Sequence, residues 1–370
     1  MTNKKFKLAA MSLATAVAVS TVGPSASAVT YYLGNGDITV DQDDTRGAFS
    51  YQGEDQGDKN RTYVNEDKAD KGTIYVKDGN TPKEEVPSTT DNSNNGTEVP
   101  TPTDHTTDSS ADNTKNSSTS ETTTTNTITV KEDVKDATIV VDGVNVDTTS
   151  TPTEVPADTK EDKTIIKVGE GADVDLTVRD SNLTTGGNGI DIGVNLEGED
   201  ENKETNVDLT LDNTEINLTE NATAGINARD NSDVDITLKG DNTIDGSEAI
   251  DKVTEGGGHD ISKDNVNIEG IRVGGEGASD SSDASEGANT KLTISGGVEK
   301  TETAETDTEE TESPTGGSLT ISDTTGGLVM ADGSDVEITD GADVTIEKTK
   351  TSGASQAGRA VTQHGDLTIS

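Results

Sequence analysis

Three aspartates occupy the same position in a phrase that the chain repeats at intervals of 33 and 27 residues. The copies are VDLTV at Val174–Val178, VDLTL at Val207–Leu211 and VDITL at Val234–Leu238. If they stack in register, Asp175, Asp208 and Asp235 form a column of carboxylates about 4.8 Å apart. Like charges directly opposite one another are destabilising. The pattern therefore predicts either calcium binding, since calcium prefers carboxylate oxygens, or side chains that splay into water.

A second calcium hypothesis concerns Asp191. The segment GGNGIDIGV at Gly186–Val194 fits the nine-residue calcium repeat G-G-x-G-x-D-x-U-x, with Asp191 as the acidic ligand. That repeat binds ions when it occurs in tandem, because neighbouring turns share each ion. This copy stands alone, so the alternative is a glycine turn that enters a strand. No bound cofactor is expected beyond this calcium hypothesis.

The elements that carry these aspartates read as strands. Val174, Leu176 and Val178 alternate with Asp175 and Thr177, which puts the apolar side chains on one face and the polar ones on the other. Shorter copies of the phrase are KLTIS, SLTIS, DVEIT, DVTIE and DLTIS, which begin at Lys291, Ser318, Asp335, Asp343 and Asp366. Glycine-led apolar segments recur between the phrases: NGIDIG, AGINA, EGIRVGG and GGLVMADG. Asp, Asn and Gly supply the turns. We predict an all-β protein.

Strands and turns at a period of about 20–30 residues indicate a solenoid, in which stacked units share one narrow core. On these motifs the chain resembles right-handed parallel β-helix proteins of the pectate-lyase-like superfold. More narrowly, it is similar to exported Thr/Asp/Gly-rich β-helical surface proteins of Gram-positive bacteria. The resemblance covers about Asn126–Ser370, with the strand-rich opening Tyr31–Asp44 as a further candidate part. An antiparallel β-sandwich is the alternative, but its strands have no reason to resemble one another.

The resemblance also implies an enzymatic alternative. Polysaccharide lyases of this superfold use Asp-bound calcium with an arginine base, and Arg179-Asp180 and Arg229-Asp230 lie on successive units. Related hydrolases carry a Gly-His-Gly element, and GGGHD at Gly256–Asp260 resembles it only in part. The competing interpretation of each Arg-Asp pair is a surface ion pair that contributes little. The three histidines, His105, His259 and His364, form no cluster in the sequence.

Aromatic residues bear on glycan binding, because sugars stack their apolar faces on aromatic rings. No Phe, Tyr or Trp follows Tyr75, so the repeats lack the commonest sugar platform. The aromatic residues of the predicted mature chain before them are Tyr31, Tyr32, Phe49, Tyr51, Tyr63 and Tyr75. A glycan on the repeats would then depend on Asp, Asn, Thr and calcium.

The first residues predict export. Lys4, Lys5 and Lys7 precede an apolar run, and Ala26-Ser27-Ala28 offers the small-x-small pattern that signal peptidase cleaves, so the mature chain begins at Val29. Removing the signal changes the formal net charge from −44 to −47, since three lysines leave with it. Such a chain repels nucleic acid and anionic membranes. Membrane insertion of the mature chain is not expected. The chain has no cysteine, so burial and hydrogen bonds must stabilise it.

Composition divides the chain into four parts: a signal peptide at 1–28, a strand-rich segment at 29–78, a disordered Thr/Ser/Asp-rich linker at 79–126, and β-helix repeats at 127–370. Acidic tracts at Gly198–Thr205, Gly275–Thr290 and Lys300–Thr315 are insertions between rungs, as solvated spacers or binding loops. Because the last residues stop inside a strand phrase, we expect the chain to continue beyond Ser370.

These observations favour a secreted or cell-surface bacterial protein without catalytic activity. Its role would be adhesin-like or structural, with many weak polar contacts along a repetitive face and a surface glycan or a protein of a host or neighbouring cell as partner. The alternatives are a carbohydrate-binding surface protein and a calcium-dependent polysaccharide lyase.

Overall fold

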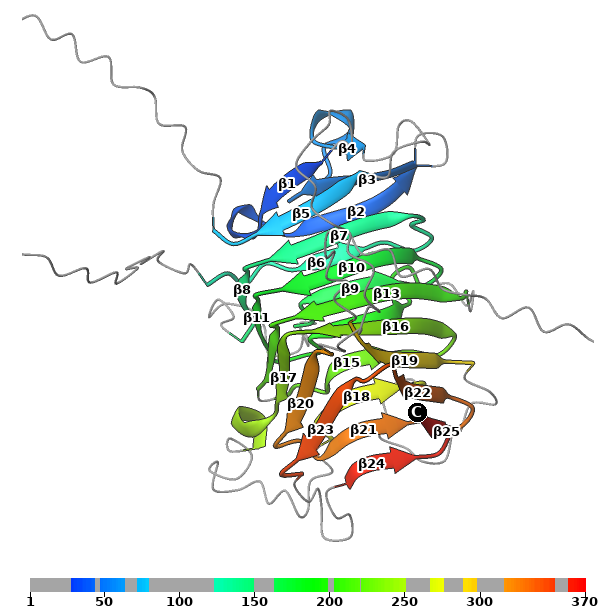
Figure 1. Cartoon of the computed structure of the whole chain (residues 1–370). Helices are drawn as coiled ribbons and strands as arrows, with labels where there is room; N and C mark the ends of the chain where they lie inside the picture. The colour runs from blue at the N-terminus through cyan, green and yellow to red at the C-terminus, as the bar shows by residue number, and fades with distance from the viewer. Residues whose placement is uncertain are drawn as a thin grey trace, which may run out of the picture.

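The protein is all-β, with long parallel sheets (Figure 1). The computed structural model describes residues 28–43, 47–63, 72–79, 123–149, 163–198, 203–219, 221–250, 267–275, 289–297, 316–349 and 359–370. The predicted signal peptide before Ala28, residues 80–122 of the predicted linker, and the segment with Gly256–Asp260 lie outside these ranges. Within the described ranges, no helix has both the length and the apolar character needed to span a membrane.

The strands form three sheets. Sheet A holds β1 (Val29–Tyr32), β5 (Thr73–Lys77), β7 (Ala137–Asp142), β10 (Asp173–Arg179), β13 (Thr205–Asp212), β16 (Ser232–Lys239), β19 (Lys291–Gly296), β22 (Asp335–Thr339) and β25 (Asp366–Ile369). Sheet C holds β8 (Asn145–Asp147), β11 (Asn182–Thr185), β14 (Glu215–Leu218), β17 (Asp241–Asp245), β20 (Ser318–Ser322) and β23 (Asp343–Glu347).

Sheet B holds β4 (Thr62–Tyr63), β3 (Gly47–Gln52), β2 (Ile38–Asp43), β6 (Ile128–Val130), β9 (Ile166–Gly169), β12 (Ile190–Val194), β15 (Ala224–Ala228), β18 (Glu269–Val273), β21 (Gly326–Met330) and β24 (Arg359–Gln363). Strand pairs in all three sheets are parallel, apart from the antiparallel pairs β2–β3 and β3–β4.

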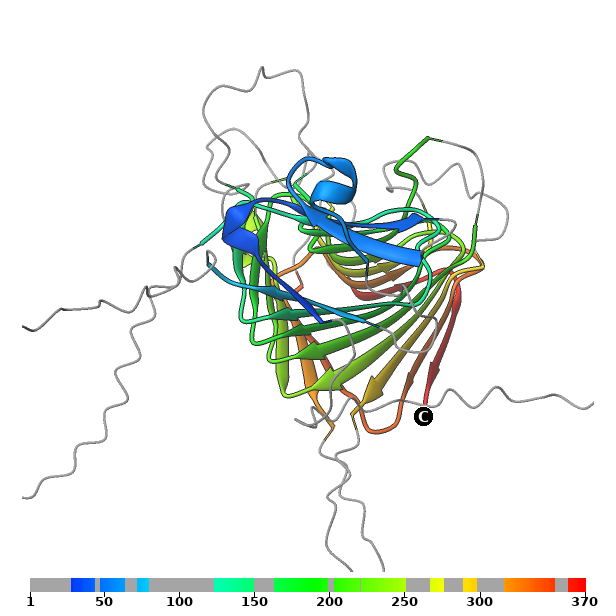
Figure 2. The same ribbon diagram turned by 90° about the horizontal axis from the view of Figure 1, so that it is seen from above.

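From β7 to β25 the chain visits sheets A, C and B in constant rotation. A strand in one sheet therefore pairs with the strand three elements later, for example β10 with β13 and β13 with β16. Seen from above, the three sheets surround a common interior (Figure 2). This arrangement is compatible with the predicted parallel β-helix.

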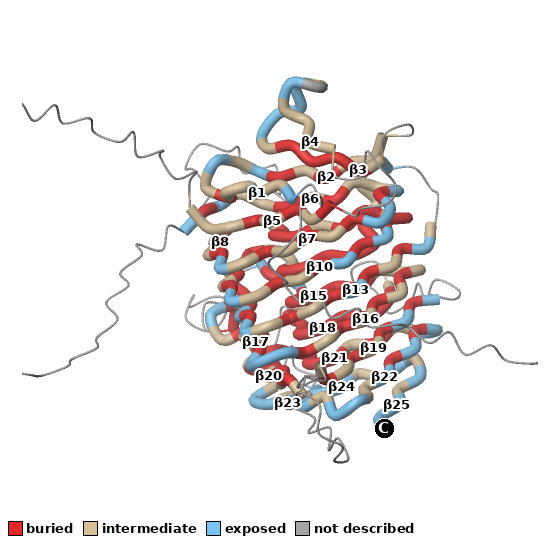
Figure 3. Tube along the Cα trace, turned by 45° about the horizontal axis from the view of Figure 1, so that its top comes forward, coloured by how far each residue is buried: buried red, intermediate tan, exposed pale blue. Residues whose placement is uncertain are grey.

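The core is a column of aliphatic side chains that repeats from strand to strand. In β10, β13 and β16 the apolar positions are buried, and the polar positions between them are exposed or half-buried (Figure 3). Val174, Val207 and Val234 are register partners, and so are Asp175, Asp208 and Asp235. The predicted parallel stacking of the three phrases is therefore confirmed.

The shorter copies of the phrase divide between two sheets. KLTIS, DVEIT and DLTIS form β19, β22 and β25 of sheet A, whereas SLTIS and DVTIE form β20 and β23 of sheet C. The glycine-led segments form β12, β15, β18 and β21 of sheet B. Sequence similarity did not separate these sheets, because the same alternation suits any strand with one face buried.

The recurring glycine at the start of these sheet B strands has a steric cause. Gly189, Gly225, Gly270 and Gly327 lie where sheet B approaches the isoleucines of sheet C. A methyl group at Gly225 would lie 2.5 Å from Cγ2 of Ile244 and 2.8 Å from the carbonyl oxygen of Gly270. Because a side chain at this position would have to displace the backbone of the next strand, which costs free energy, only glycine fits.

The turn from sheet A to sheet C uses left-handed backbone. Asp180 and Asn213 have φ values of 48° and 52°, and Gly240 has 58° at the corresponding place. Asp, Asn and Gly tolerate this conformation best, which explains why the predicted turn contains them. The Asn213 side chain also donates to Oδ1 of Asp180 at 3.3 Å, which links successive turns.

The N-terminal strands belong to the same sheets as the repeats. β1 and β5 extend sheet A, and β2 extends sheet B beside β6. The antiparallel strands β3 and β4 then bring Phe49 within 5.3 Å of the Tyr63 ring, with the Arg61 guanidinium 4.4 Å from the Phe49 centroid. The aromatic segment is therefore continuous with the repeats at the level of the sheets.

Candidate functional site

The outward face of sheet A carries the acidic column that the sequence predicts, defined as Asp175, Asp208 and Asp235. A shallow depression beside it is lined by Asp173, Asn206, Val207, Asp208, Asp233 and Asp235. At the Asp175 end of the acidic column, the Thr138 hydroxyl donates to Oδ2 of Asp175 at 3.3 Å. The stacking thus places several carboxylates side by side on one face.

The electrostatic consequence is clearest at Asp208, in the middle of the column. Its partial burial between neighbouring strands, together with the charges of Asp175, Asp235 and Asp173, raises the pKa of this carboxyl above its usual value of 3.8. Burial and like charges both favour the neutral acid. The column therefore costs free energy at neutral pH.

The acidic column does not converge on a single point. Among the residues that the structure describes, no group of three or more His, Asp or Glu side chains could hold a metal ion. Stacked strands place carboxylates side by side rather than around a centre. The column has the oxygen ligands of the calcium hypothesis without the enclosing geometry that calcium sites have.

A second column on the same face alternates in charge. Its register partners are Lys77, Asp142, Arg179, Asp212 and Lys239. Oδ2 of Asp142 lies 3.1 Å from Nζ of Lys77 and 2.9 Å from Nη2 of Arg179. The hydrogen bond from Arg179, followed by that from Lys77, lowers the pKa of Asp142. Arg179 therefore pairs across strands with Asp142, while Asp180 occupies the turn.

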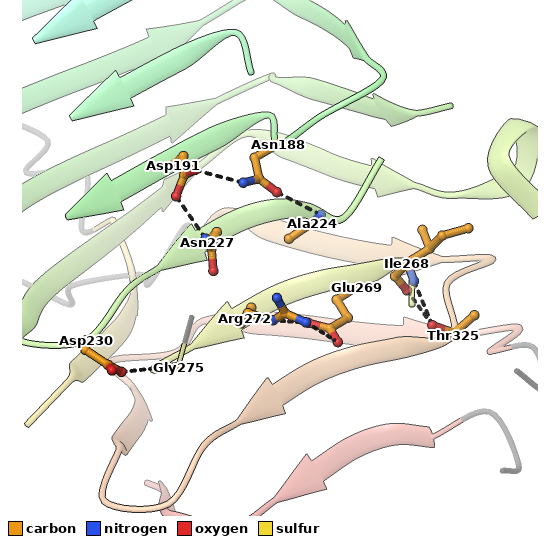
Figure 4. A network of polar contacts seen from close by, with 10 residues as sticks. All are labelled: Asn188, Asp191, Ala224, Asn227, Asp230, Ile268, Glu269, Arg272, Gly275 and Thr325. Atoms are coloured by element: carbon orange, nitrogen blue, oxygen red, sulfur yellow. Dashed lines mark hydrogen bonds and ion pairs between the residues drawn. The ribbon is translucent and has the colours of Figure 1, made fainter. Parts of the chain in front are cut away.

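The outward face of sheet B differs from that of sheet A, because its polar side chains are buried. Asp191, Asn227 and Arg272 are register partners on β12, β15 and β18. Their exposed fractions are 2%, 5% and 4%. Figure 4 shows these residues and their polar contacts, in which Asp191 bonds to Asn227 and Arg272 bonds to Glu269. Buried polar groups of this kind require hydrogen-bond partners.

Asp191 has partners for both carboxylate oxygens. Nε and Nη2 of Arg229 donate to Oδ1 and Oδ2, each at 2.9 Å. Asn188 donates to Oδ2 and Asn227 donates to Oδ1, again at 2.9 Å. This satisfied carboxylate serves as a junction between rungs, in keeping with the alternative of a lone glycine turn and strand at Gly186–Val194.

Glu269 and Arg272 form a second buried ion pair on β18, two strands along sheet B from the β12 strand of Asp191. Nε and Nη2 of Arg272 donate to the Glu269 carboxylate at 2.6 and 2.9 Å. Nearby, the Thr325 hydroxyl accepts from the Ile268 amide at 2.8 Å and donates to the Ile268 carbonyl at 2.9 Å. Oδ1 of Asn227 is buried and has no hydrogen-bond partner among the residues that the structure describes. The Thr325 contacts join successive rungs, whereas the Glu269–Arg272 ion pair lies within β18.

The network bears on the lyase hypothesis. Arg229 binds Asp191 in a bidentate manner, whereas Asp230 accepts a hydrogen bond from the Gly275 amide. An arginine base must be free to reach a substrate proton, and a bidentate carboxylate opposes that role. Nδ1 of His364 lies 3.9 Å from Asp332, and His105 and His259 lie outside the described residues.

No family model matches this chain, and no curated protein or solved structure matches it either.

The buried polar row of sheet B was missed from the sequence, although a signal for it exists. The segments GIDIG, GINA and GIRVG each place one polar residue between two apolar ones, at Asp191, Asn227 and Arg272. A polar residue alternating with apolar ones is normally assigned to solvent. What distinguishes this row is that its members can pair with one another and with their neighbours.

Proposed function

We propose that the chain is a right-handed parallel β-helix of the pectate-lyase-like type. The constant rotation of strands through sheets A, C and B supports this fold, as do the parallel pairs three elements apart. Crossovers between parallel strands of one sheet are right-handed in nearly all proteins. The low apolar content fits, since a solenoid needs only a narrow core.

The proposed role is that of a secreted or cell-surface bacterial protein that binds a partner without catalysis, as adhesins do. The observation that carries this proposal is the outward face of sheet A. There, columns of Asp, Thr and charged residues repeat in register along one sheet. A repetitive face of this kind suits many weak contacts with a repetitive partner, whose combined strength exceeds that of any single one.

Two features support the non-catalytic and exported parts of the proposal. The buried carboxylates of Asp191 and Glu269 are both held by arginines, which leaves neither poised as a free general base. The first strand of the described residues begins at Val29, the residue predicted to start the mature chain. The strongly acidic surface suits an extracellular protein that must stay soluble and avoid anionic membranes.

A depletion experiment tests the proposed role. The mature chain, residues 29–370, is incubated with insoluble polysaccharides and with intact bacterial and host cells, in calcium or in EDTA. The expected result is loss of protein from solution on at least one of these, with no soluble sugar released. Release of unsaturated or reducing sugars would contradict the non-catalytic role, and the absence of any depletion would contradict binding.

Carbohydrate binding is the second candidate. It gains support from the continuity of sheet A, because β1 and β5 bring tyrosines onto the face that carries the polar columns.

A further inference from the structure

Two tyrosine rings lie on the outward face of sheet A. In β5, Ile74 and Val76 are fully buried, so Tyr75 between them belongs to the opposite face. In β1, Tyr31 packs toward the core, so the adjacent Tyr32 also belongs to the outward face. Both outward tyrosines are half-buried, which leaves part of each side chain open to solvent.

The two tyrosines are diagonal neighbours. Thr30 is the register partner of Tyr75, and Tyr32 is the partner of Lys77. Diagonal positions on adjacent strands lie about 7–8 Å apart, which is within reach of aromatic side chains. The rings therefore border one continuous patch on two adjacent strands.

Hydrogen-bonding groups lie beside the rings. Lys77 and Arg179 both donate to one oxygen, Oδ2 of Asp142. The side chains of Lys77 and Arg179 are 44% and 34% exposed, so part of each remains open to solvent. The open part of each of these side chains can donate to a ligand oxygen at the surface.

We propose that Tyr32, Tyr75 and the row Lys77, Asp142 and Arg179 form a binding patch for a neutral polysaccharide. This inference rests on the proposed binding role and deepens it by naming the ligand class and the place. A pyranose ring presents an apolar C–H face that packs on an aromatic ring, and its hydroxyls bond to charged side chains. The surrounding acidity disfavours an anionic glycan.

The patch continues along the stack. Val140, Thr177 and Thr210 follow Tyr75 as successive register partners on β7, β10 and β13. These strands advance by about 4.8 Å each. A glycan held at Tyr75 would thus run from the aromatic end over the threonine column of the repeats. Several sugars of one chain then contact sheet A.

Intrinsic fluorescence gives a direct test, because the chain has five tyrosines and no tryptophan. The mature chain is titrated with cellohexaose, chitohexaose, xylohexaose and mannohexaose, with a galacturonate hexamer as the anionic probe. Saturation-transfer NMR measures the same binding independently. The expected result is saturable binding of at least one neutral hexamer that exceeds binding of the galacturonate.

Variants then locate the patch. Tyr75→Leu and Tyr32→Leu, which keep an apolar side chain but lose the flat ring, should each weaken binding about tenfold or more. Tyr75→Phe should bind nearly as the parent does. Thr320→Ala, on the outward face of sheet C, is the matched control and should change nothing. Circular dichroism and the melting temperature establish that each variant is folded.

Two results would overturn the patch. One is that no neutral hexamer binds the folded parent chain, and the other is that Tyr75→Leu, still folded, binds as tightly as the parent. Either result leaves the proposed role standing if cells still deplete the protein from solution. Release of sugar products would instead contradict the non-catalytic role. The patch itself would then be tested only by how the tyrosine variants change the binding of the hexamers.

Discussion

Replacing Asp208 with asparagine should stabilise the protein at neutral pH. Asp208 has Asp175 and Asp235 as its register partners on the two adjacent strands. Two unit charges about 5 Å apart in water repel by about 0.8 kcal/mol, and physiological salt roughly halves this. Because Asp208 has two such neighbours, Asp208→Asn should raise the free energy of unfolding by about 1 kcal/mol. Water sets the dielectric constant between these charges, because the three carboxylates lie on the outward face of sheet A.

The effect should depend on pH in a definite direction. Folding raises the pKa of Asp208, so the folded protein binds this proton more tightly than the unfolded chain does. The stability gained from this proton is fully present below the usual pKa of 3.8, and it is lost as the pH rises through the raised pKa of the folded state. The stability gained by Asp208→Asn should therefore be full at pH 7 and should vanish at pH values below 3.8, where the carboxyl of the parent protein is already neutral. It should also shrink in about 1 M salt.

The assay is the melting temperature of the mature chain by circular dichroism. A gain of about 1 kcal/mol corresponds to a rise of about 2–4 °C in a domain of this size. Asp212→Asn on the same strand is the matched control, because its register partners are Arg179 and Lys239. It should lower the melting temperature. A fall for Asp208→Asn at pH 7, or equal shifts for both variants, would refute the reasoning.

Three further predictions concern the interior and the metal. Asp191→Ala removes the carboxylate that accepts from Nε and Nη2 of Arg229. The free energy of unfolding should therefore fall by about 3 kcal/mol, measured by urea titration against Asp175→Ala as an exposed control. Gly225→Ala should cost about 1–3 kcal/mol in the same titration, because its methyl group would lie 2.5 Å from Ile244; parent-like stability would contradict the steric account. EDTA should leave the melting temperature unchanged, since the described carboxylates do not converge; a clear fall would revive the calcium hypothesis.

The sequence predicted the parallel stacking because repetition reports register directly. Near-identical phrases such as those at Val174 and Val207 have reason to align only if each strand lies on its predecessor. The acidic column at Asp208 followed from that alignment together with strand spacing. Both predictions rest on local regularity, which one sequence displays.

Other features depend on how distant segments meet. Alternation could not assign SLTIS to sheet C, nor show that Asp191 lies in a buried pair with Arg229. Likewise, the composition of 79–126 predicts a linker, which assigns Tyr75 to a separate N-terminal segment. Its place on sheet A follows from pairing of β5 with β7, which composition does not report.

The most direct test of the central claim, that sheet A is the binding face, compares Thr210→Arg with Thr320→Arg in the depletion experiment. Both threonines are half-buried on outward faces, Thr210 on sheet A and Thr320 on sheet C. On the partner that depletes the parent chain, Thr210→Arg should lose most of the depletion, while Thr320→Arg should match the parent. Equal depletion by both folded variants, or loss only with Thr320→Arg, would contradict the claim.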